Sequence, residues 1–219
     1  MVTYNEIKHN EAIKTYIKKA DESLSSLGYT EHSFAHVTKV AKTAGYILTE
    51  MGADAREIEL AKIAGYMHDI GNLVNRVDHS QSGAVLAFRI LSNLGMEAED
   101  VATVICAIGN HDEGTGVPVD NVSAALILAD KSDVRRTRVR NRDTLNFDIH
   151  DRVNYSATSS QLTINEDKTE VVLDLQIDTK YSSVMDYFEI FLGRMMLCKR
   201  AAEKLGLRFR LVINGQSLI

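Results

Sequence analysis

The stretch GYMHDIGNLV, from Gly65 to Val74, places a histidine and an aspartate side by side in an otherwise apolar segment. Burying an imidazole and a carboxylate is costly unless a partner neutralises them. On a helix, consecutive residues point about 100° apart, because one turn takes roughly 3.6 residues. We therefore expect His68 and Asp69 to face each other poorly, and each to have a partner elsewhere in the chain.

The chain has 219 residues, of which 45% are hydrophobic and 25% charged, an ordinary composition for a globular protein. This length allows one large domain, or one domain with an appendage, around a sizeable core. The two cysteines, Cys106 and Cys198, lie far apart in helix-like patterns. This spacing argues against a disulfide framework or a cysteine zinc site, and it suits a reducing cytoplasm.

Targeting and partner signals are weak. The N-terminal residues lack the apolar core of a signal peptide, and no apolar run is long enough to span a bilayer. The formal net charge of -5 does not suggest a polymeric nucleic acid as partner, although it permits a local basic pocket. We therefore expect a cytoplasmic protein with no membrane contact. The sequence indicates no particular oligomeric state.

From Val2 to about Arg136, apolar residues recur almost throughout at helical spacing. One helix opens with DARE, Asp54 to Glu57, which resembles a capping box. Another is stopped by Gly95. The expected helices cover Tyr4–Leu27, a stripe from Val37 to Met51, Asp54–Met67, Ser82–Leu94, Ala98–His111 and Asn121–Arg136.

The pattern changes after about Asn146. SQLTIN and EVVLDLQID alternate apolar and polar residues around a polar EDKT turn, which predicts a β-hairpin. A helix from about Val184 and a strand in LRFRLVIN follow. We expect a mainly α protein, with a helical metal-binding domain at residues 1–145 and a small α+β subdomain at 146–219 packed on it. Nothing in the second half indicates catalysis, and His150 is expected to be solvated.

Four of the seven histidines and two aspartates fall where predicted helix edges meet the core. A lone histidine at such a place is more often a hydrogen-bonded core residue than a ligand. The carboxylate that closes the apolar run AALILA would be desolvated unless it pairs, for example with Lys131, or binds a metal. The joint occurrence favours a ligand set converging from several helices of a bundle. The residues are His36, His68, Asp69, His79, His111 and Asp130.

The order of these residues resembles that of the HD-domain metal-dependent phosphohydrolase superfamily. The segments around them also stand where that superfamily carries such segments: EHSFAHVTKVAKTAG, AGYMHDIGNL, HSQSGAVLAFRIL, AIGNHDEG and LILADKSD. The resemblance runs from about Glu31 to Asp133, roughly half of the chain. An HD dipeptide alone carries no signal, but the ordered set in its helical context is specific.

The resemblance implies a ligand set and catalytic residues. The simplest members bind one metal through residues that correspond to His36, His68, Asp69 and Asp130. Members with two further histidines, here His79 and His111, bind two metals that the HD aspartate bridges. The resemblance thus implies a dinuclear centre with His68 and Asp69 as catalytic residues. Mixed imidazole and carboxylate ligands suit iron, our first expectation, or manganese, nickel, cobalt or zinc, rather than magnesium alone.

The basic segment DKSDVRRTRVRNR, from Asp130 to Arg142, follows the last proposed ligand. Arginine forks suit phosphate oxygens. Lys131 and Arg135 are the phosphate-binding candidates, because we expect them to follow Asp130 on the same helix. The rest of the run, from Arg138 to Arg142, is expected to be a solvated surface.

Three further features could contribute to a substrate site. His32 stands one turn before His36, so it is a candidate for contact with substrate or with the ligands. Tyr66 lies beside the HD pair. The loop DEGTGVPVD, Asp112 to Asp120, holds the only proline and two glycines, and could serve as a lid. His9 is expected to be an ordinary hydrogen-bonded residue.

The leading hypothesis is a phosphatase or phosphodiesterase that hydrolyses a phosphate mono- or diester of a small nucleotide or related metabolite. Two divalent ions about 3.5–4 Å apart can acidify a hydroxide between them and stabilise a transferring phosphoryl group. Two alternatives stay open. One is an HD-type di-iron oxygenase that cleaves C–C or C–P bonds. The other is a non-catalytic metal or nucleotide sensor that uses the α+β part as its interaction surface.

Overall fold

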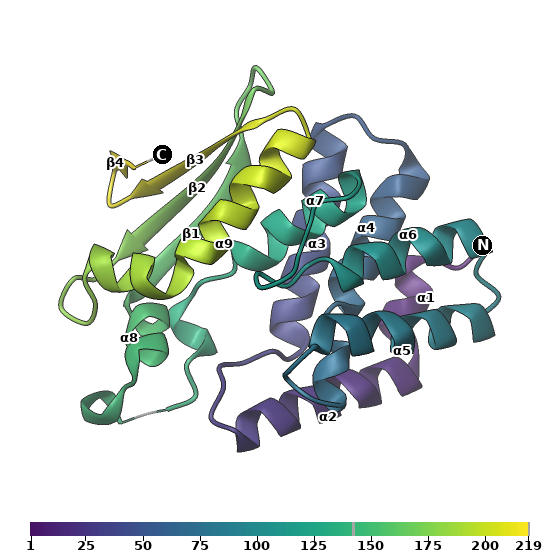
Figure 1. Ribbon diagram of the computed structural model, residues 1–219, viewed down its shortest axis with the longest axis horizontal. Coiled ribbons are helices and arrows are strands. Elements are labelled where there is room, and N and C mark those ends of the chain that lie inside the picture. Colours follow the sequence, from purple (N-terminus) through teal and green to yellow (C-terminus); the bar gives the residue numbers. More distant parts are fainter. Residues whose placement is uncertain (142, 219) are drawn as a thin grey trace.

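The computed structural model describes residues 1–141 and 143–218. Helices fill the N-terminal part, and a sheet with one long helix forms the C-terminal part (Figure 1). The expected fold class, mainly α with a small C-terminal α+β extension, is confirmed. The bundle helices are α1 (Tyr4–His9), α2 (Glu11–Ser26), α3 (Phe34–Glu50), α4 (Ala55–Met67), α5 (His79–Asn93), α6 (Ala98–Gly109) and α7 (Asn121–Lys131), with the 3-10 helix η1 (Ile70–Leu73) between α4 and α5.

The helix expected over Tyr4–Leu27 is divided in two. Asn10 ends α1 with extended backbone, and its side-chain oxygen accepts the backbone N–H groups of Ala12 and Ile13 at the start of α2. Asparagine is among the preferred N-cap residues because its short side chain reaches these unpaired donors. The division was missed because the apolar positions continue at helical spacing across it.

Two boundaries near the polar residues also differ from expectation. α5 begins at His79 rather than at Ser82, after Asp78 in the left-handed region with φ 55°. α7 ends at Lys131, and Arg135 is extended with φ -161° and ψ 146°. The prediction that Arg135 follows Asp130 on the same helix is therefore wrong.

Two glycines permit close contacts between the segments that carry the polar residues. A Cβ on Gly65 of α4 would lie 2.8 Å from the Cα of Ala41 in α3, closer than real Cβ atoms approach backbone. A Cβ on Gly71 of η1 would clash with the carbonyl oxygen of His79 at the start of α5. These positions bring α3, the end of α4 and the start of α5 together at backbone contact distance.

The sheet has the strand order β1-β2-β3-β4, formed by β1 (Ala157–Ile164), β2 (Glu170–Ile177), β3 (Arg208–Ile213) and β4 (Gln216–Ser217). β1 and β2 are antiparallel, which confirms the predicted hairpin. β2 and β3 are parallel, and a parallel pair needs a crossover connection. That crossover is α9 (Val184–Lys204).

α9 joins the sheet to the bundle. It packs against α7 on one side and against β3 and β2 on the other (Figure 1). Its buried residues, Tyr187, Phe191 and Met195, belong to the same core cluster as Leu173 of β2 and Leu126 of α7. The bundle and the sheet therefore share one continuous core. The short helices η2 (Arg136–Arg138), η3 (Thr144–Asn146) and α8 (Ile149–Ser156) connect α7 to the sheet.

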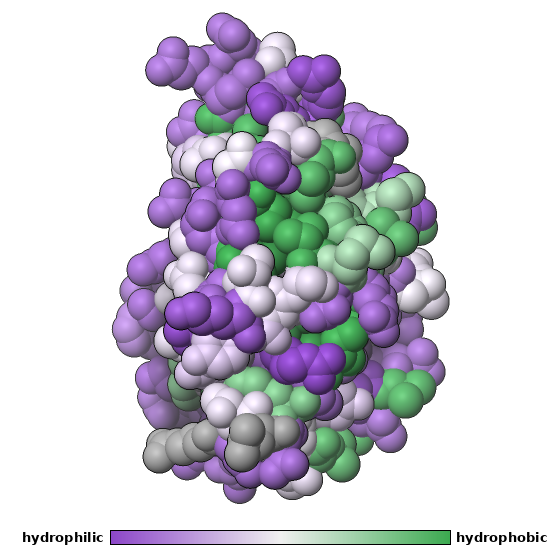
Figure 2. Space-filling model, turned by 90° about the vertical axis from the view of Figure 1, so that its left-hand side faces the viewer, coloured by the Kyte–Doolittle hydropathy of each residue, from purple (hydrophilic) through white to green (hydrophobic). Residues whose placement is uncertain are grey.

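The surface on the side of β4 and α8 is mixed. A hydrophobic area at mid-height is surrounded by hydrophilic residues (Figure 2). Exposed apolar groups are common on folded proteins, so this area alone identifies no partner. Among the described residues, no helix combines the length and the apolarity needed to cross a bilayer.

Candidate metal centre

All six residues singled out from the sequence meet at one place in the bundle, at the ends or edges of five helices. His36 lies in α3, His68 caps the C-terminus of α4, and Asp69 follows it. The other three come from the first residue of α5, the residue that follows the C-cap of α6, and the penultimate residue of α7: His79, His111 and Asp130. The imidazoles of His36 and His68 are fully buried.

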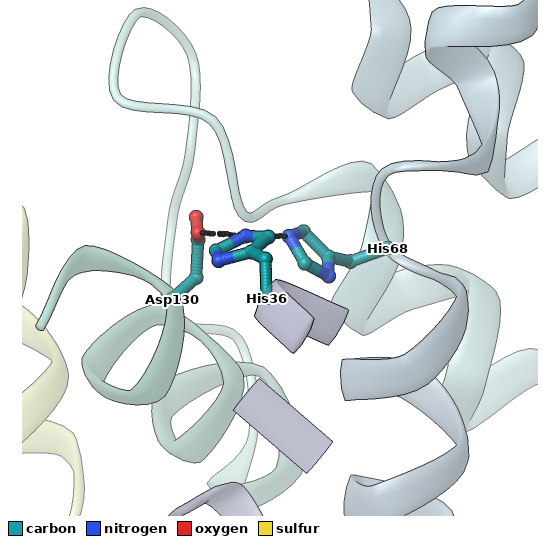
Figure 3. A group of neighbouring side chains, drawn as sticks. All are labelled: His36, His68 and Asp130. Carbon is teal, nitrogen blue, oxygen red and sulfur yellow. Dashed lines mark hydrogen bonds and ion pairs between the residues drawn. The ribbon is translucent and has the colours of Figure 1, made fainter. Parts of the chain in front are cut away.

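One part of the cluster, which we call the carboxylate-rich half, consists of His36, His68, Asp130 and the Oδ2 atom of Asp69 (Figure 3 shows the first three). His36 Nε2 lies 3.3 Å from His68 Nε2, 3.3 Å from Asp130 Oδ1 and 3.5 Å from Asp69 Oδ2. His68 Nε2 lies 3.2 Å from Asp69 Oδ2 and 3.5 Å from Asp130 Oδ1. Four donor atoms therefore surround one point.

These separations fit a shared transition-metal ion. Nitrogen and oxygen ligands lie about 2.0–2.2 Å from such an ion, so ligands of one ion stand roughly 3.0–3.4 Å apart in octahedral or tetrahedral geometry. The distances between the donor atoms of the carboxylate-rich half, 3.2–3.5 Å, match that spacing. The residues present fit a divalent ion held by two imidazoles and two carboxylates.

The other part, which we call the imidazole half, consists of His79, His111 and the Oδ1 atom of Asp69. The two Nε2 atoms lie 3.2 Å apart, and they lie 3.6 Å and 4.0 Å from Asp69 Oδ1. Asp112 Oδ1 stands 4.0 Å from His79 Nε2. The two oxygens of Asp69 thus face different pairs of histidines, the arrangement that a bridging carboxylate requires.

The outer nitrogens of the histidines fix how the rings point. Nδ1 of His68, His79 and His111 each lies at hydrogen-bond distance from a backbone carbonyl oxygen three residues earlier. Nδ1 of His36 is 2.8 Å from Asp133 Oδ2. Carbonyl and carboxylate oxygens only accept, so each Nδ1 carries a hydrogen, and a neutral ring presents the lone pair of its Nε2 inward. Such support is typical of metal-ligating histidines. Lone pairs 3.2–3.3 Å apart repel unless a proton or a metal ion lies between them.

The electrostatics of the two halves differ. Burial acts to lower the pKa of His68, but the carboxylates of Asp69 and Asp130 outweigh it and raise this pKa to about 10. Burial, together with the charges of His68 and Lys131, holds the pKa of His111 well below its ordinary value. In the absence of an ion, the carboxylate-rich half therefore retains a proton, while the imidazole half stays neutral. A metal ion entering the first half must displace that proton.

The expectation that His68 and Asp69 face each other poorly is wrong, since His68 Nε2 and Asp69 Oδ2 are 3.2 Å apart. The reason is local. α4 ends at Met67, and Asp69 leaves helical geometry with φ -92° and ψ 3°. The angle of about 100° between consecutive residues holds only inside a helix.

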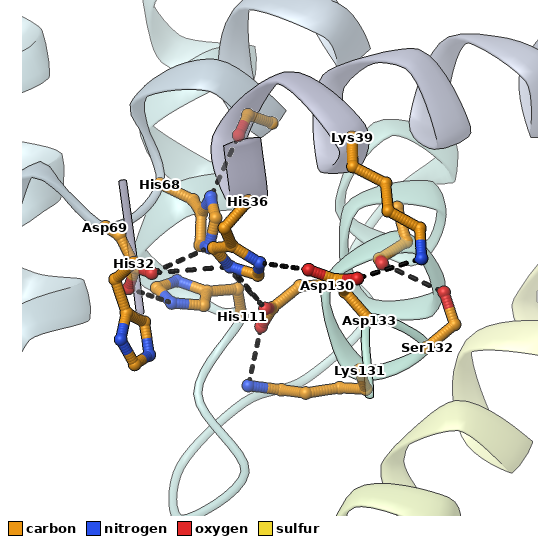
Figure 4. A network of polar contacts seen from close by, with 12 residues as sticks. His32, His36, Lys39, His68, Asp69, His111, Asp130, Lys131, Ser132 and Asp133 are labelled. Carbon is orange, nitrogen blue, oxygen red and sulfur yellow. Dashed lines mark hydrogen bonds and ion pairs between the residues drawn. The ribbon is translucent and has the colours of Figure 1, made fainter. Parts of the chain in front are cut away.

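Asp133 supports the carboxylate-rich half from behind. Its Oδ2 accepts from His36, and its Oδ1 lies 2.9 Å from Lys39 Nζ and 3.0 Å from Arg135 Nε (Figure 4 shows His36 and Lys39). Burial opposes ionisation of Asp133, but His36 and nearby cations hold its pKa well below the ordinary value. We did not assign it from the sequence, although the segment LILADKSD contains it.

Lys131, a predicted phosphate ligand, lies beside the centre. Its Nζ is 2.7 Å from Asp130 Oδ2 and 2.7 Å from Glu113 Oε2. It contacts the carboxylate oxygen of Asp130 that faces away from the histidines (Figure 4). Lys131 therefore orients Asp130, and it also lines the small chamber around the ligands.

Arg135, the other predicted phosphate ligand, is directed elsewhere. Its guanidinium contacts Glu31 Oε2 at 2.9 Å and Asp133 Oδ1 at 3.0 Å. Arg138 is only 4% exposed, and it donates to the backbone oxygens of Glu31 and Asp133. The prediction that Arg138 belongs to a solvated surface is therefore wrong. Arg140 pairs with Asp21 at the surface. Arg142 lies outside the described residues.

The remaining candidates divide by position. His32 lines the chamber, with its ring centroid 5.5 Å from that of His36 and its Nδ1 donating to the Thr30 carbonyl oxygen. Tyr66 is buried in the core, with its ring against Tyr4. His150 lies on α8, as an exposed residue lining a larger cavity.

Besides Asp133 and Arg138, three groups near the centre were missed by sequence reasoning. Glu113 comes from the loop proposed as a lid, and it contacts Lys131 and Arg194. Arg194 comes from α9, in the half where no functional residue was expected, and Arg76 from the turn before α5. Arg194 follows Phe191 by three positions on an apolar helix face. A cation on that face is the sequence feature that indicates a buried role for Arg194.

Comparisons with known proteins identify a family and several relatives. The family model described as HD domain matches residues 33–152. An uncharacterized protein of Methanocaldococcus jannaschii is 26% identical over 160 residues, which cover 63% of this chain and 61% of that protein. Ribonuclease Y 1 of Pediococcus pentosaceus is 33% identical over 125 residues, 56% of this chain and 22% of the enzyme. Ribonuclease Y of Sulfurimonas denitrificans is 34% identical over 101 residues, 46% and 18% respectively.

Among solved structures, a predicted HD superfamily hydrolase from an uncultured Thermotogales bacterium is 26% identical to this chain. It matches with a TM-score of 0.46, covering 58% of this chain and 69% of that one. The chain spans about three fifths of the archaeal relative and about a fifth of the ribonucleases. The family match covers more than half of the chain, and it includes the centre described above. The protein belongs to the HD domain family.

Proposed function

We propose that the protein is a metal-dependent phosphohydrolase that acts on a phosphate mono- or diester of a small nucleotide or related metabolite. The observation that carries this proposal is the position of Asp69, whose two oxygens face two separate pairs of imidazoles. This arrangement suits two divalent ions bridged by one carboxylate. The relatives named ribonuclease Y support phosphate-ester cleavage as the reaction class.

The residues that would hold the ions are His36, His68, Asp69 and Asp130 on one side, and His79, His111 and Asp69 on the other. When bound there, divalent ions would acidify a water and stabilise the charge that develops on a transferring phosphoryl group. Iron is the first candidate, and manganese, nickel, cobalt and zinc suit the same donors.

The protein's own groups complete the site. Lys131 neutralises the second oxygen of Asp130 and keeps Oδ1 directed at the histidines. Burial and the positive charge of Arg138 hold the pKa of His32 well below its ordinary value, so this imidazole is neutral and its Nε2 can accept a hydrogen bond at the chamber. Arg76, Arg138 and Arg194 also line the chamber, where their positive charge favours an anionic substrate.

The test is release of phosphate or nucleotide by protein loaded separately with each candidate metal. A panel of phosphate mono- and diesters should contain substrates that are hydrolysed by the wild type and not by Asp69→Ala. Asp167→Ala, which changes an exposed carboxylate in the β1–β2 turn, is the matched control and should keep full activity. If no metal-loaded sample releases phosphate or nucleotide from any member of the panel, the proposal is wrong.

A further inference from the structure

A cavity of about 450 Å³ adjoins the metal centre. Its walls come from the α2–α3 connection, the turn before α5, α8 and α9, so the bundle and the C-terminal part both form it. Four residues line both this cavity and the chamber around the ligands: His32, Arg76, Arg138 and Arg194. A volume of this size accommodates one small molecule.

The inner end of the cavity is cationic. Arg76 Nη1 lies 3.2 Å from His79 Nε2, and among the described residues its guanidinium forms no ion pair with a carboxylate. Arg194 uses Nε for Glu113, at 3.0 Å. Each guanidinium lies over an aromatic ring of the cavity wall, Arg76 at 5.7 Å from the centroid of Tyr29 and Arg194 at 4.3 Å from that of Phe191. Two oriented forks therefore flank the point where an anionic group would meet the metal ligands.

The cavity wall that is not shared with the chamber carries carboxylates. Asp148 and Asp151 of the α8 segment line the cavity but not the chamber, and so does Asn154, one turn further along. Asp148 accepts from the backbone N–H of Asp151, and Asp151 Oδ2 accepts from Asn141 at 3.3 Å. In the described part of the chain, neither carboxylate forms an ion pair with a lysine or arginine. Two carboxylates and an amide in the wall of a cavity favour a ligand group that donates N–H hydrogen bonds.

Resting on the proposed function, we infer that this cavity holds the non-phosphate part of the substrate and selects phosphate esters whose far end carries an amino group. The phosphate lies at the arginine end beside the metal ligands, and the N–H donors meet Asp148 and Asp151. An aliphatic ammonium group and the exocyclic amine of a nucleobase both supply this chemistry.

The experiment compares two matched pairs of phosphate esters on Mn²⁺-loaded protein, by kcat/KM where phosphate is released and by calorimetry where it is not. One pair is 2-aminoethyl phosphate and ethyl phosphate. The other is adenosine 5′-monophosphate and purine riboside 5′-monophosphate, which differ only in the exocyclic amine. Hydrogen bonds to charged groups make the amino member of at least one pair bind about tenfold more tightly. The pair that shows the difference identifies the kind of amine.

Variants locate the selectivity. In the double variant Asp148→Asn/Asp151→Asn, the amino and non-amino members of each pair should bind about equally. Asparagine keeps the oxygen that caps α8, so the variant retains the fold. Arg76→Gln should weaken both members of each pair about equally and leave their ratio unchanged. Asp167→Asn and Arg200→Gln, at exposed positions outside the cavity, are the charge-matched controls.

The inference is overturned if none of the four esters binds, if neither pair shows a preference, or if the preference survives in the double aspartate variant. Phosphate release is followed in the same samples, so the two proposals fail separately. Selective binding without release of phosphate contradicts the hydrolase proposal and leaves the cavity assignment standing. Release without selectivity contradicts the cavity assignment alone.

Discussion

The two halves of the metal centre share Asp69 but are built differently. The carboxylate-rich half has two imidazoles and two carboxylates, with donor atoms 3.2–3.5 Å apart. The imidazole half has two imidazoles and one shared carboxylate oxygen, at distances of up to 4.0 Å. Arg76 adds a positive charge 3.2 Å from His79 Nε2. Negative charge and ligand count both favour the first half, so we expect it to hold its ion more tightly.

The largest expected effect is that of Asp69→Ala, because this residue belongs to both halves. Loss of a shared ligand should reduce the content of both ions to background, a larger effect than the roughly 10–100-fold cost of changing an outer-shell partner. Elemental analysis after dialysis measures it. Retention of a full ion in this variant would contradict the bridging role.

Two further substitutions should distinguish the metal affinities of the two halves. Asp130→Ala should remove the tightly held ion, whereas His111→Ala should remove only the weakly held one. Metal titration followed by calorimetry distinguishes them. His111→Ala should retain one tight binding step, and Asp130→Ala should lose it. Equal losses in the two variants would show that the halves do not differ in affinity.

Asp133→Ala should have a smaller effect, confined to the carboxylate-rich half. It removes the acceptor that orients the ring of His36, so affinity for the tight ion should fall about 10–100-fold. Lys39→Gln is the matched control, because it removes the partly exposed ion-pair partner of the same carboxylate. Loss of this ion pair should cost less than about 1 kcal/mol of stability. An unchanged tight step in Asp133→Ala would exclude an orienting role for Asp133.

The smallest expected effect is the pH dependence of stability in metal-free protein, where the halves should act in opposite directions. The pKa of His68 is raised to about 10, so its contribution is fully present below about pH 6.5 and is lost as pH rises through 10. The pKa of His111 is lowered, so this residue destabilises the fold as pH falls below about 6.5.

Thermal unfolding in chelator between pH 5 and pH 10.5 checks these signs. His68→Gln should flatten the alkaline side of the stability profile, and His111→Gln the acid side. Because lysines and tyrosines also titrate above about pH 9, the difference between variant and wild type is the measured quantity. The signs are wrong if His68→Gln changes only the acid side.

The sequence predicts more of the metal centre than of the residues that surround it. His36, His68, Asp69 and Asp130 stand out because a polar residue on an apolar helix edge needs a partner, which is a local signal. Arg194 could not be placed, since α9 reaches the bundle only through the parallel crossover between β2 and β3. Which helix covers an open site depends on the tertiary structure. The alternation of apolar and polar residues that predicts β2 and β3 does not say where the helix between them packs.

The basic segment after Asp130 shows the same limit. Its charges are visible in the sequence, but α7 ends at Lys131. After the turn that follows, Arg138 is buried and Arg135 contacts Glu31. A helix end shifted by a few residues changes the direction of every side chain after it. The two glycine contacts, at Gly65 and Gly71, likewise depend on neighbours that are distant in the sequence or lie across a turn.

The most direct test of the central claim is the crystal structure of Fe- or Mn-loaded protein, with the ions located by anomalous scattering. The account predicts two ions roughly 3.5–4 Å apart, one on each side of Asp69, with Oδ2 on the ion of His36 and His68 and Oδ1 on the ion of His79 and His111. A single ion, or two ions that do not share Asp69, would contradict it.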